Sequence, residues 1–247
     1  MGEAVFVHGN PETAAIWGPL LGALGRADVV TLSPPGFGAP VPEGFGATTN
    51  DYLAWLVGEL ERRPEPVDLV GHDWGGGHVA RVAVERPDLI RSWAIDIAGC
   101  FAPDYVWHDM ARVWQTPGKG EDAVAAMMAM PADARAARYE AMGMLGVASQ
   151  VSAALDDGTA RCILALYRSA AQPAMAVYGQ RLAAASARPG LVLVPTEDPY
   201  TGGEQRARWG AGQAGAQVAL LRGLGHWWML QDPDAGAQAL GAFWSSL

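Results

Sequence analysis

The sequence predicts an α/β fold built on a mostly parallel β-sheet of about six strands. Short runs rich in Val, Ile and Leu alternate with longer segments whose apolar residues recur at helical spacing. This alternation is typical of parallel strands joined by crossover helices. Residues 99–187 depart from it, because they contain many Ala and Met residues and no convincing strand.

The expected strands are short apolar runs bounded by Gly, Pro or charged residues, and in chain order they are Ala4–His8, Asp28–Leu32, Val67–Val70, Ser92–Ile97, Leu191–Pro195 and Val218–Leu221. Helices are expected at Thr13–Leu24, Thr48–Arg62, Gly76–Glu85 and Pro233–Ser246. The Pro- and Gly-rich loop 33–46 is expected to shape one wall of a pocket.

We expect the chain to divide into a core and an insertion. Residues 1–98 and 188–247 form the sheet and its flanking helices, and residues 99–187 form a short helical cap between two strands. A cap there lies over the carboxyl ends of the strands, where open α/β sheets bind ligands. The Met-rich piece Met127–Met130 is interpreted as adaptable core.

The composition excludes several classes of protein. Half of the 247 residues are hydrophobic and 17% are charged, as in globular proteins. The net charge of −9 argues against nucleic acid and anionic membranes as partners. The chain runs at once into a strand, so we expect no signal peptide and a cytoplasmic location. Cys100 and Cys162 are too few for a disulfide scaffold and form no metal-binding cluster.

The central motif is Gly71-His72-Asp73-Trp74-Gly75, between the third strand and a helix. It has the form of a nucleophile elbow with aspartate as the middle residue. The sharp turn strains the middle residue and needs small residues on both sides, and the helix N-terminus directs amides and positive dipole at the site. The pattern predicts Asp73 as a nucleophile; the alternative is a helix N-cap.

Two further residues complete a catalytic triad. His226 follows the last strand in a Gly-containing loop and is the predicted general base, the alternative being a structural histidine. Asp198, after the fifth strand, is the predicted acid that orients His226. Asp96 is the rival acid, and Glu197 is a weaker one.

The remaining histidines receive no catalytic role from the sequence. His72 and His78 flank the elbow and are interpreted as packing or surface residues, and His108 lies in the insertion. The loop after the first strand, His8-Gly9-Asn10-Pro11, is expected to supply a backbone amide to an oxyanion hole. The Asn10 side chain can hold a leaving anion, or serve only to form the turn.

An aspartate nucleophile narrows the chemistry. A carboxylate that attacks an sp³ carbon forms an alkyl ester, which suits epoxides and carbon–halogen bonds. Water activated by His226 then hydrolyses the ester at its carbonyl carbon. No metal or organic cofactor is needed, and plain esterase chemistry is disfavoured because serine is the usual nucleophile for it.

These motifs resemble the epoxide hydrolase and haloalkane dehalogenase branch of the α/β-hydrolase superfamily. The resemblance covers nearly the whole chain and rests on motifs that occur in the family's order: His8–Pro11, Gly71–Gly76, Glu197–Pro199 and Gly225–Trp227. It implies an α/β-hydrolase fold that lacks the usual first two strands, because this chain begins almost at His8. The strand Ala4–His8 is still expected inside the sheet.

The same resemblance offers two reactions. Epoxide hydrolases use cap tyrosines to protonate the epoxide oxygen, and Tyr167 looks like one of them. A second is not evident near Met110–Trp114, and Tyr105 and Tyr139 are the substitutes. The resemblance favours hydrolysis of an epoxide to a diol.

Haloalkane dehalogenases instead hold the halide with an Asn and a Trp, and Asn10 and Trp74 match these positions. Halide release is therefore the alternative. A haloacid dehalogenase and a non-catalytic ligand-binding protein are further alternatives.

The expected partners are a small hydrophobic substrate and water, bound by a monomer or a homodimer. Tryptophans are expected to line the pocket, and the candidates are Trp74, Trp107, Trp114, Trp227 and Trp228.

Overall fold

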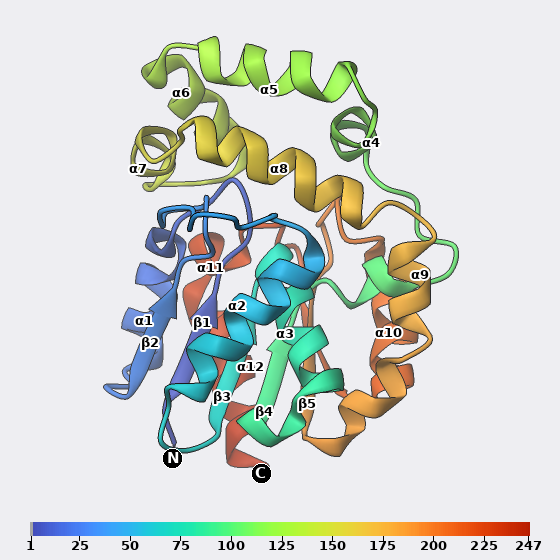
Figure 1. Cartoon of the computed structure of the whole chain (residues 1–247). Helices are drawn as coiled ribbons and strands as arrows, with labels where there is room; N and C mark the ends of the chain where they lie inside the picture. Colours follow the sequence, from blue (N-terminus) through green and yellow to red (C-terminus); the bar gives the residue numbers. More distant parts are fainter. Residues whose placement is uncertain (1) are drawn as a thin grey trace.

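The computed structural model describes residues 2–247 and contains one six-stranded sheet (Figure 1). Its strands are β1 (Ala4–Val7), β2 (Val29–Leu32), β3 (Val67–Gly71), β4 (Ile90–Ile95), β5 (Gly190–Pro195) and β6 (Gln217–Leu221). The order is β2-β1-β3-β4-β5-β6, and each neighbouring pair is parallel. Each strand lies where the sequence predicts it, with ends displaced by at most two residues. The first strand lies inside the sheet, as predicted.

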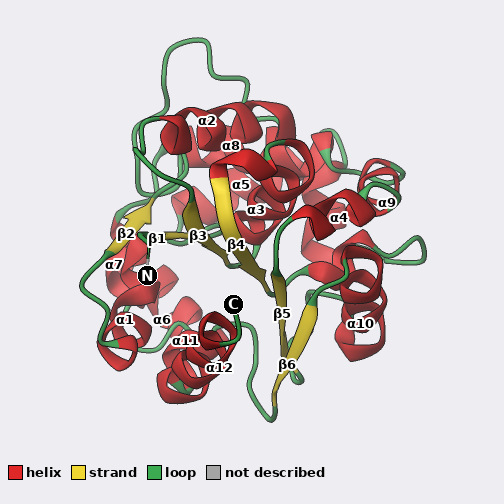
Figure 2. Ribbon diagram, turned by 90° about the horizontal axis from the view of Figure 1, so that it is seen from below, coloured by secondary structure: helices red, strands yellow, loops and turns green. Residues whose placement is uncertain are grey.

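Helices cover both faces of the sheet, which explains why β1, β3 and β5 are buried along their whole length (Figure 2). Successive strand residues point to opposite faces. In β1, Val5 and Val7 pack in the core beneath α2 (Thr49–Glu61) and α3 (Trp74–Glu85).

Ala4 and Phe6 pack in the opposite core with α1 (Gly18–Leu24) and α12 (Pro233–Ser245). The sheet therefore separates two apolar cores, and α11 (Trp228–Gln231) lies on the same side as α1 and α12 (Figure 2).

The described part of the chain between β4 and β5 is helical and contains no strand, and most of it forms a layer across the top of Figure 1. Its helices are α4 (Asp109–Gln115), α5 (Lys119–Ala129), α6 (Ala132–Met142), α7 (Ala148–Ala153), α8 (Asp157–Ser169) and α9 (Ala174–Gly179). Helix α8 turns an apolar side towards the core, where Cys162, Ile163, Leu166 and Tyr167 are buried. Met127 and Met128 in α5 are half-buried.

Loop 33–46 passes beneath α8, where the Thr159 hydroxyl donates a hydrogen bond to the Gly36 carbonyl at 2.8 Å. A side chain at Gly36 has no room, because a Cβ there would lie 2.5 Å from Cys162 Sγ. This loop supports the helical layer and supplies none of the described residues that line the pocket at Asp73, contrary to expectation.

Helix α10 (Gly203–Ala214) has no counterpart among the predicted helices. It packs closely through small residues rather than through large apolar ones: a Cβ at Gly210 would lie 2.5 Å from the Ala98 carbonyl oxygen. That contact is with the short 3₁₀ helix η3 (Ala98–Phe101), which follows β4. Within residues 2–247, we find no helix with the length and apolar character required to cross a bilayer.

Candidate active site

Asp73 occupies the tight turn between β3 and α3, with φ 49° and ψ −127°. A non-glycine residue with positive φ is strained, at a cost on the order of 1–3 kcal/mol. The turn closes because its flanking residues lack side chains. A Cβ at Gly71 would lie 2.5 Å from the Gly75 carbonyl oxygen, and one at Gly75 would lie 2.1 Å from the Val7 carbonyl oxygen. Backbone strain and close packing therefore place the Asp73 carboxylate at the carboxyl edge of the sheet, where its side chain is only 18% exposed.

The two oxygens of Asp73 have different surroundings. Oδ1 accepts a hydrogen bond from the backbone N–H of Asn10 at 3.1 Å. This approach requires glycine at position 9, since a Cβ there would lie 2.1 Å from Oδ1. Oδ2 faces His226, with 3.7 Å to Nε2. One oxygen is thus held by the Asn10 backbone N–H, and the other lies beside His226.

His226 and Asp198 form a close pair. His226 Nδ1 donates a hydrogen bond to Asp198 Oδ2 at 2.8 Å, and Asp198 Oδ1 accepts another from the backbone N–H of Tyr200 at 2.7 Å. The loops that carry them are joined by a hydrogen bond from Glu197 N–H to the Leu224 carbonyl. Of the three candidate acids, Asp198 is the one that accepts a hydrogen bond from His226, and Asp96 and Glu197 are not among the partners of His226 within residues 2–247.

Asp96 belongs instead to a buried network beneath Asp73. Its Oδ1 accepts from the backbone N–H of Asp73 at 3.1 Å, and its Oδ2 accepts from His72 Nδ1 at 2.5 Å. The indole N–H of Trp228 donates to the same Oδ2 at 2.8 Å. Asp96 therefore holds the backbone of the elbow in place.

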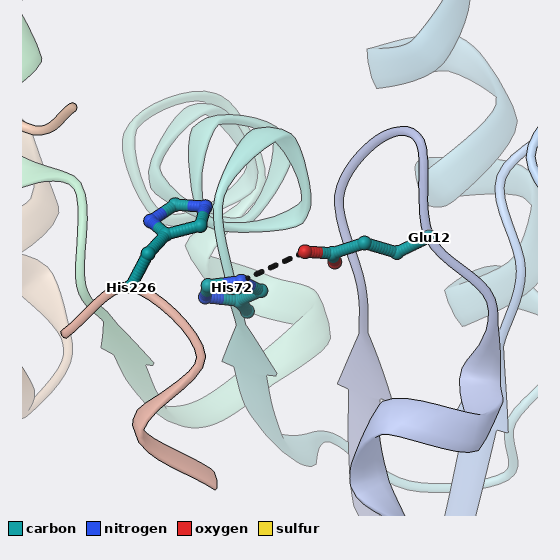
Figure 3. Close-up of side chains that lie close together, drawn as sticks. All are labelled: Glu12, His72 and His226. Carbon is teal, nitrogen blue, oxygen red and sulfur yellow. Dashed lines mark hydrogen bonds and ion pairs between the residues drawn. The ribbon is translucent and has the colours of Figure 1, made fainter. Parts of the chain in front are cut away.

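Glu12 completes this network on the opposite side of His72 (Figure 3). Its Oε1 accepts from His72 Nε2 at 3.1 Å and from Trp227 Nε1 at 2.5 Å, while its Oε2 accepts from the Gly9 backbone at 3.0 Å. His72 is fully buried and donates from both ring nitrogens. It is therefore an imidazolium between two carboxylates, and not the packing or surface residue that the sequence suggested.

Nitrogen and oxygen atoms of Glu12, His72 and His226 lie within 4.8 Å of one another (Figure 3). These atoms suit a hydrogen-bonded ionic network better than a metal site. Both nitrogens of His72 carry protons that bond to Asp96 and Glu12, so His72 has no lone pair for an ion.

The pKa values follow from burial and from these charges. Burial raises the pKa of Asp73 to about 6, although His226 acts in the opposite direction. Burial alone would raise the pKa of Glu12, but the charge and hydrogen bond of His72 lower it to about 2. Burial alone would lower the pKa of His72 and His226, and the neighbouring carboxylates raise both above the usual histidine value.

The pocket above Asp73 has about 360 Å³ of space, part of it open to solvent. Its lining is mostly apolar and aromatic and comprises Asp73, Trp74, Gly77, Ile97, Cys100, Tyr105, Trp107, His108, Tyr167, Met175, Tyr200 and Thr201. Of the tryptophans expected there, only Trp74 and Trp107 belong to this lining. His108 and Tyr200 were not predicted as lining residues, because neither lies in a recognisable motif.

The other three tryptophans lie behind the pocket. The Trp114 ring packs against Tyr167 with 4.8 Å between ring centroids, whereas Trp227 and Trp228 donate their indole N–H groups to the buried network below. The prediction that Trp114, Trp227 and Trp228 line the pocket is therefore wrong, because these residues pack behind it.

Tyr167 extends from α8 into the same pocket as Asp73. Its ring lies edge-on to Trp74, with 5.1 Å between ring centroids. Burial and the nearby Asp73 charge raise the pKa of Tyr167 well above 10, so its hydroxyl keeps its proton at neutral pH. Tyr105 and Tyr139 were the two candidates for a second cap tyrosine. Tyr105 lines the pocket, but its hydroxyl donates a hydrogen bond to the Tyr200 carbonyl at 2.8 Å. Tyr139 packs in the opposite core, away from the pocket.

The Asn10 side chain is buried, and its backbone N–H contacts Asp73. Its amide nitrogen and oxygen have no hydrogen-bond partner within residues 2–247, although the side chain is only 6% exposed. It is not part of the pocket lining that includes Trp74. Of the two residues expected to hold a halide, Trp74 lines this pocket and Asn10 does not.

Comparison with known proteins identifies a family and several relatives. The family model described as the alpha/beta hydrolase family matches residues 4–239. An epoxide hydrolase from Caballeronia sordidicola is 34% identical over 101 residues, which cover 37% of this chain and 30% of the relative. An (E)-2-((N-methylformamido)methylene)succinate hydrolase from Acinetobacter baylyi is 29% identical over 93 residues, 37% of this chain and 35% of the relative. These matches span about a third of each relative.

Similarity among solved structures extends over the whole chain. The crystal structure of the haloalkane dehalogenase DbeA from Bradyrhizobium elkani matches with a TM-score of 0.71 and 19% identity, covering 100% of this chain and 92% of that one. At this level of identity the similarity establishes the fold alone.

Proposed function

Because the chain belongs to the alpha/beta hydrolase family and has the fold predicted from its sequence, we propose that it hydrolyses an epoxide to a diol through an alkyl ester on Asp73. The aromatic pocket lining makes a small hydrophobic epoxide the proposed substrate. The observation that carries the proposal is that Asp73 and Tyr167 line one pocket, a nucleophile from the elbow and a proton donor from α8.

In the first half-reaction, Asp73 Oδ2 attacks an epoxide carbon and the carbon–oxygen bond of the ring breaks. Tyr167 gives its proton to the oxygen that leaves. Oδ1 becomes the carbonyl oxygen of the new ester and remains at the Asn10 backbone N–H.

In the second half-reaction, His226 removes a proton from water, and the hydroxide attacks the ester carbonyl carbon. The Asn10 backbone N–H stabilises the charge that develops on Oδ1. The diol leaves with the proton held by His226. The proton of the regenerated Asp73 carboxyl group returns to the Tyr167 phenolate, so that protons balance over the cycle.

Release of halide from a haloalkane is the second candidate, and the buried Asn10 amide without a partner favours it. A halide held between Asn10 and Trp74 would need both side chains at the reacting carbon. Asn10 does not share the pocket lining with Trp74, whereas Tyr167 does, which supports the epoxide. A protein that only binds ligands would not need the His226–Asp198 pair.

Single-turnover mixing with styrene oxide and with n-butyl bromide tests the choice. We expect diol from styrene oxide and a loss of about 10²-fold or more in the Tyr167→Phe variant, which keeps the ring but lacks the proton donor. Asn10→Ala serves as the matched comparison. Halide release that depends on Asn10, with no diol from styrene oxide, would establish the second candidate and refute the first.

A further inference from the structure

Three consecutive glycines, Gly75, Gly76 and Gly77, lie near the start of α3. Close packing explains the first two. A Cβ at Gly75 would lie 2.1 Å from a carbonyl oxygen of β1, and one at Gly76 would lie 3.1 Å from Ile97 Cγ1. At Gly77, leaving aside the adjoining residues and the backbone of α3, a Cβ would approach a single heavy atom of the described chain within 4 Å, Trp74 Cε3 at 3.6 Å. This is an ordinary van der Waals distance, so there is room for a side chain at Gly77.

The backbone does not account for Gly77 either. This residue lies inside a helix, where its N–H donates to the Asp73 carbonyl at 3.1 Å, a bond that alanine also makes. Glycine in a helix interior is less favourable than alanine, because glycine loses more conformational entropy on folding. Neither packing nor helix geometry therefore explains why this position lacks a side chain.

The space beside Gly77 is part of the active-site pocket. Gly77 is buried and lines the pocket together with Asp73 and Tyr167. It follows Asp73 by four residues, so it lies one turn further along the same face of α3. Trp74 and Gly77 are the residues that α3 contributes to this lining. Beyond Trp74, the α3 wall of the pocket is therefore bare backbone.

Much of the remaining lining consists of aromatic rings in contact with one another. The Trp107 ring centroid lies 5.7 Å from that of Trp74 and 5.5 Å from that of Tyr167. Rings at these separations are packed together, so no substituent fits between them. A substrate bound at Asp73 with its oxygen at Tyr167 still needs space for the rest of the molecule, and the bare backbone of Gly77 supplies it.

We propose that Gly77 determines which substrates fit: the apolar substituent of the epoxide lies against its bare backbone, one helical turn from Asp73. This inference rests on the proposed function for the identity of the reacting group. It assigns a terminal epoxide with a short unbranched apolar chain as the substrate class. A chain that covers Gly77 leaves water for an apolar surface, so each CH2 group of the chain contributes to binding.

The ratio of the kcat/KM values for the terminal epoxide of hexane and for propylene oxide tests this assignment. In the wild type the ratio should be at least about tenfold in favour of the hexane epoxide, which buries three more CH2 groups. It should fall several-fold in Gly77→Ala and to about unity in Gly77→Val, since the added methyl groups occupy the space of the chain. A ratio in both Gly77 variants equal to that of the wild type would overturn the proposal.

Gly58 provides the matched controls, Gly58→Ala and Gly58→Val. It lies inside α2 and outside the pocket lining, and a Cβ there would approach no heavy atom of the described chain within 4 Å, leaving aside the adjoining residues and the helix backbone. Both controls should keep the wild-type ratio. The same loss of preference in the Gly58 variants would assign the effect to the helix substitutions in general and overturn the role of Gly77.

Stability and ligand binding separate this inference from the proposed reaction. Gly77→Ala should melt at or above the wild-type temperature, because alanine favours the helix and fits beside Trp74. A melting temperature several degrees lower would assign Gly77 to packing and overturn the proposal. Hexanol affinity, measured by tryptophan fluorescence, should fall several-fold from wild type to Gly77→Ala, and an unchanged affinity would also overturn it. Loss of hexanol affinity in the variant without turnover of either epoxide by the wild type would refute the reaction and leave the role of Gly77 standing.

Discussion

Glu12 and His72 form a fully buried ion pair, with 3.1 Å between Oε1 and Nε2. Through Gly9, Glu12 also holds the loop whose Asn10 N–H meets the nucleophile. Through Asp96, His72 holds the backbone N–H of Asp73. One ionic network therefore fixes both backbone segments that meet at the Asp73 carboxylate, the loop of Asn10 and the turn of Asp73 itself.

Replacing Glu12 by Gln should destabilise the protein and misplace the Asn10 loop. The pKa of Glu12 falls from its ordinary 4.5 to about 2, which corresponds to about 3 kcal/mol of folding free energy at neutral pH. This contribution is fully present above pH 4.5 and is lost as the pH falls through about 2. Urea unfolding of wild type and Glu12→Gln at several pH values should show their difference shrinking in acid.

The matched control for this change is Glu59→Gln, since Glu59 pairs with Arg62 on the surface. Its effect should stay within about 0.5 kcal/mol. If the stability difference between wild type and Glu12→Gln does not change between pH 7 and pH 3, the pKa of Glu12 is not lowered in the folded protein.

Much of the fold could be predicted because strands and turn motifs leave local signals. The strands stood out as short apolar runs, while α10 did not, because its buried residues are Ala207, Gly210, Ala211 and Ala214. Small residues that pack against backbone carry little periodic hydrophobicity. Their role becomes visible only with the Ala98 carbonyl that they meet.

The residues of the site also differ in how well the sequence alone predicts them. Asp73, Asp198 and His226 lie in motifs, and the structure brings them together. Glu12 lies in no motif, and its partners His72 and Trp227 are 60 and 215 residues away in the chain. Such a network depends on tertiary contacts that a single sequence does not display.

The acid of the triad can be distinguished by the intermediate that accumulates. Asp198→Asn removes the carboxylate that orients His226 and stabilises its charge, so ester hydrolysis should slow by about 10²–10⁴-fold while alkylation persists. Rapid-quench mass spectrometry should then show the ester on Asp73. Asp96→Asn should lower stability without accumulation of the ester, because Asp96 contacts the backbone of the elbow and not His226. Accumulation in Asp96→Asn alone would reverse the assignment.

The base can be tested by trapping the same ester more completely. His226→Gln keeps a polar side chain but cannot remove the proton from water, so the ester formed from styrene oxide should persist. Peptide mapping should find the mass of one substrate added to the peptide that contains Asp73. Asp73→Asn is the control and should carry no added mass. Modification at another residue, or none despite turnover by the wild type, would refute the covalent mechanism.

The pH dependence of kcat/KM should report the nucleophile. Alkylation needs the Asp73 carboxylate, and burial raises its pKa to about 6, so kcat/KM for an epoxide should rise with pH through about 6. Since the pKa of Tyr167 lies well above 10, the proton donor stays protonated and the profile should remain flat up to about pH 9.5. Steady-state assays in constant-ionic-strength buffers measure both the acidic limb and the plateau. An acidic limb near pH 4 would show that the carboxylate is not perturbed.

The raised pKa of Asp73 also predicts a gain in stability when its charge is removed. The folded protein favours the protonated carboxyl group, so its contribution is favourable below the ordinary pKa of 3.8 and is lost as the pH rises through about 6. Above that pH the buried carboxylate costs about 3 kcal/mol, from a shift of roughly two pKa units. Asp73→Asn should therefore melt several degrees above the wild type at pH 8 and at nearly the same temperature at pH 4. Asp104→Asn, at an exposed position, should melt like the wild type at both pH values. An Asp73→Asn protein no more stable than the wild type at pH 8 would mean that the elbow carries no electrostatic cost, and that the nucleophile is held in place without loss of folding free energy.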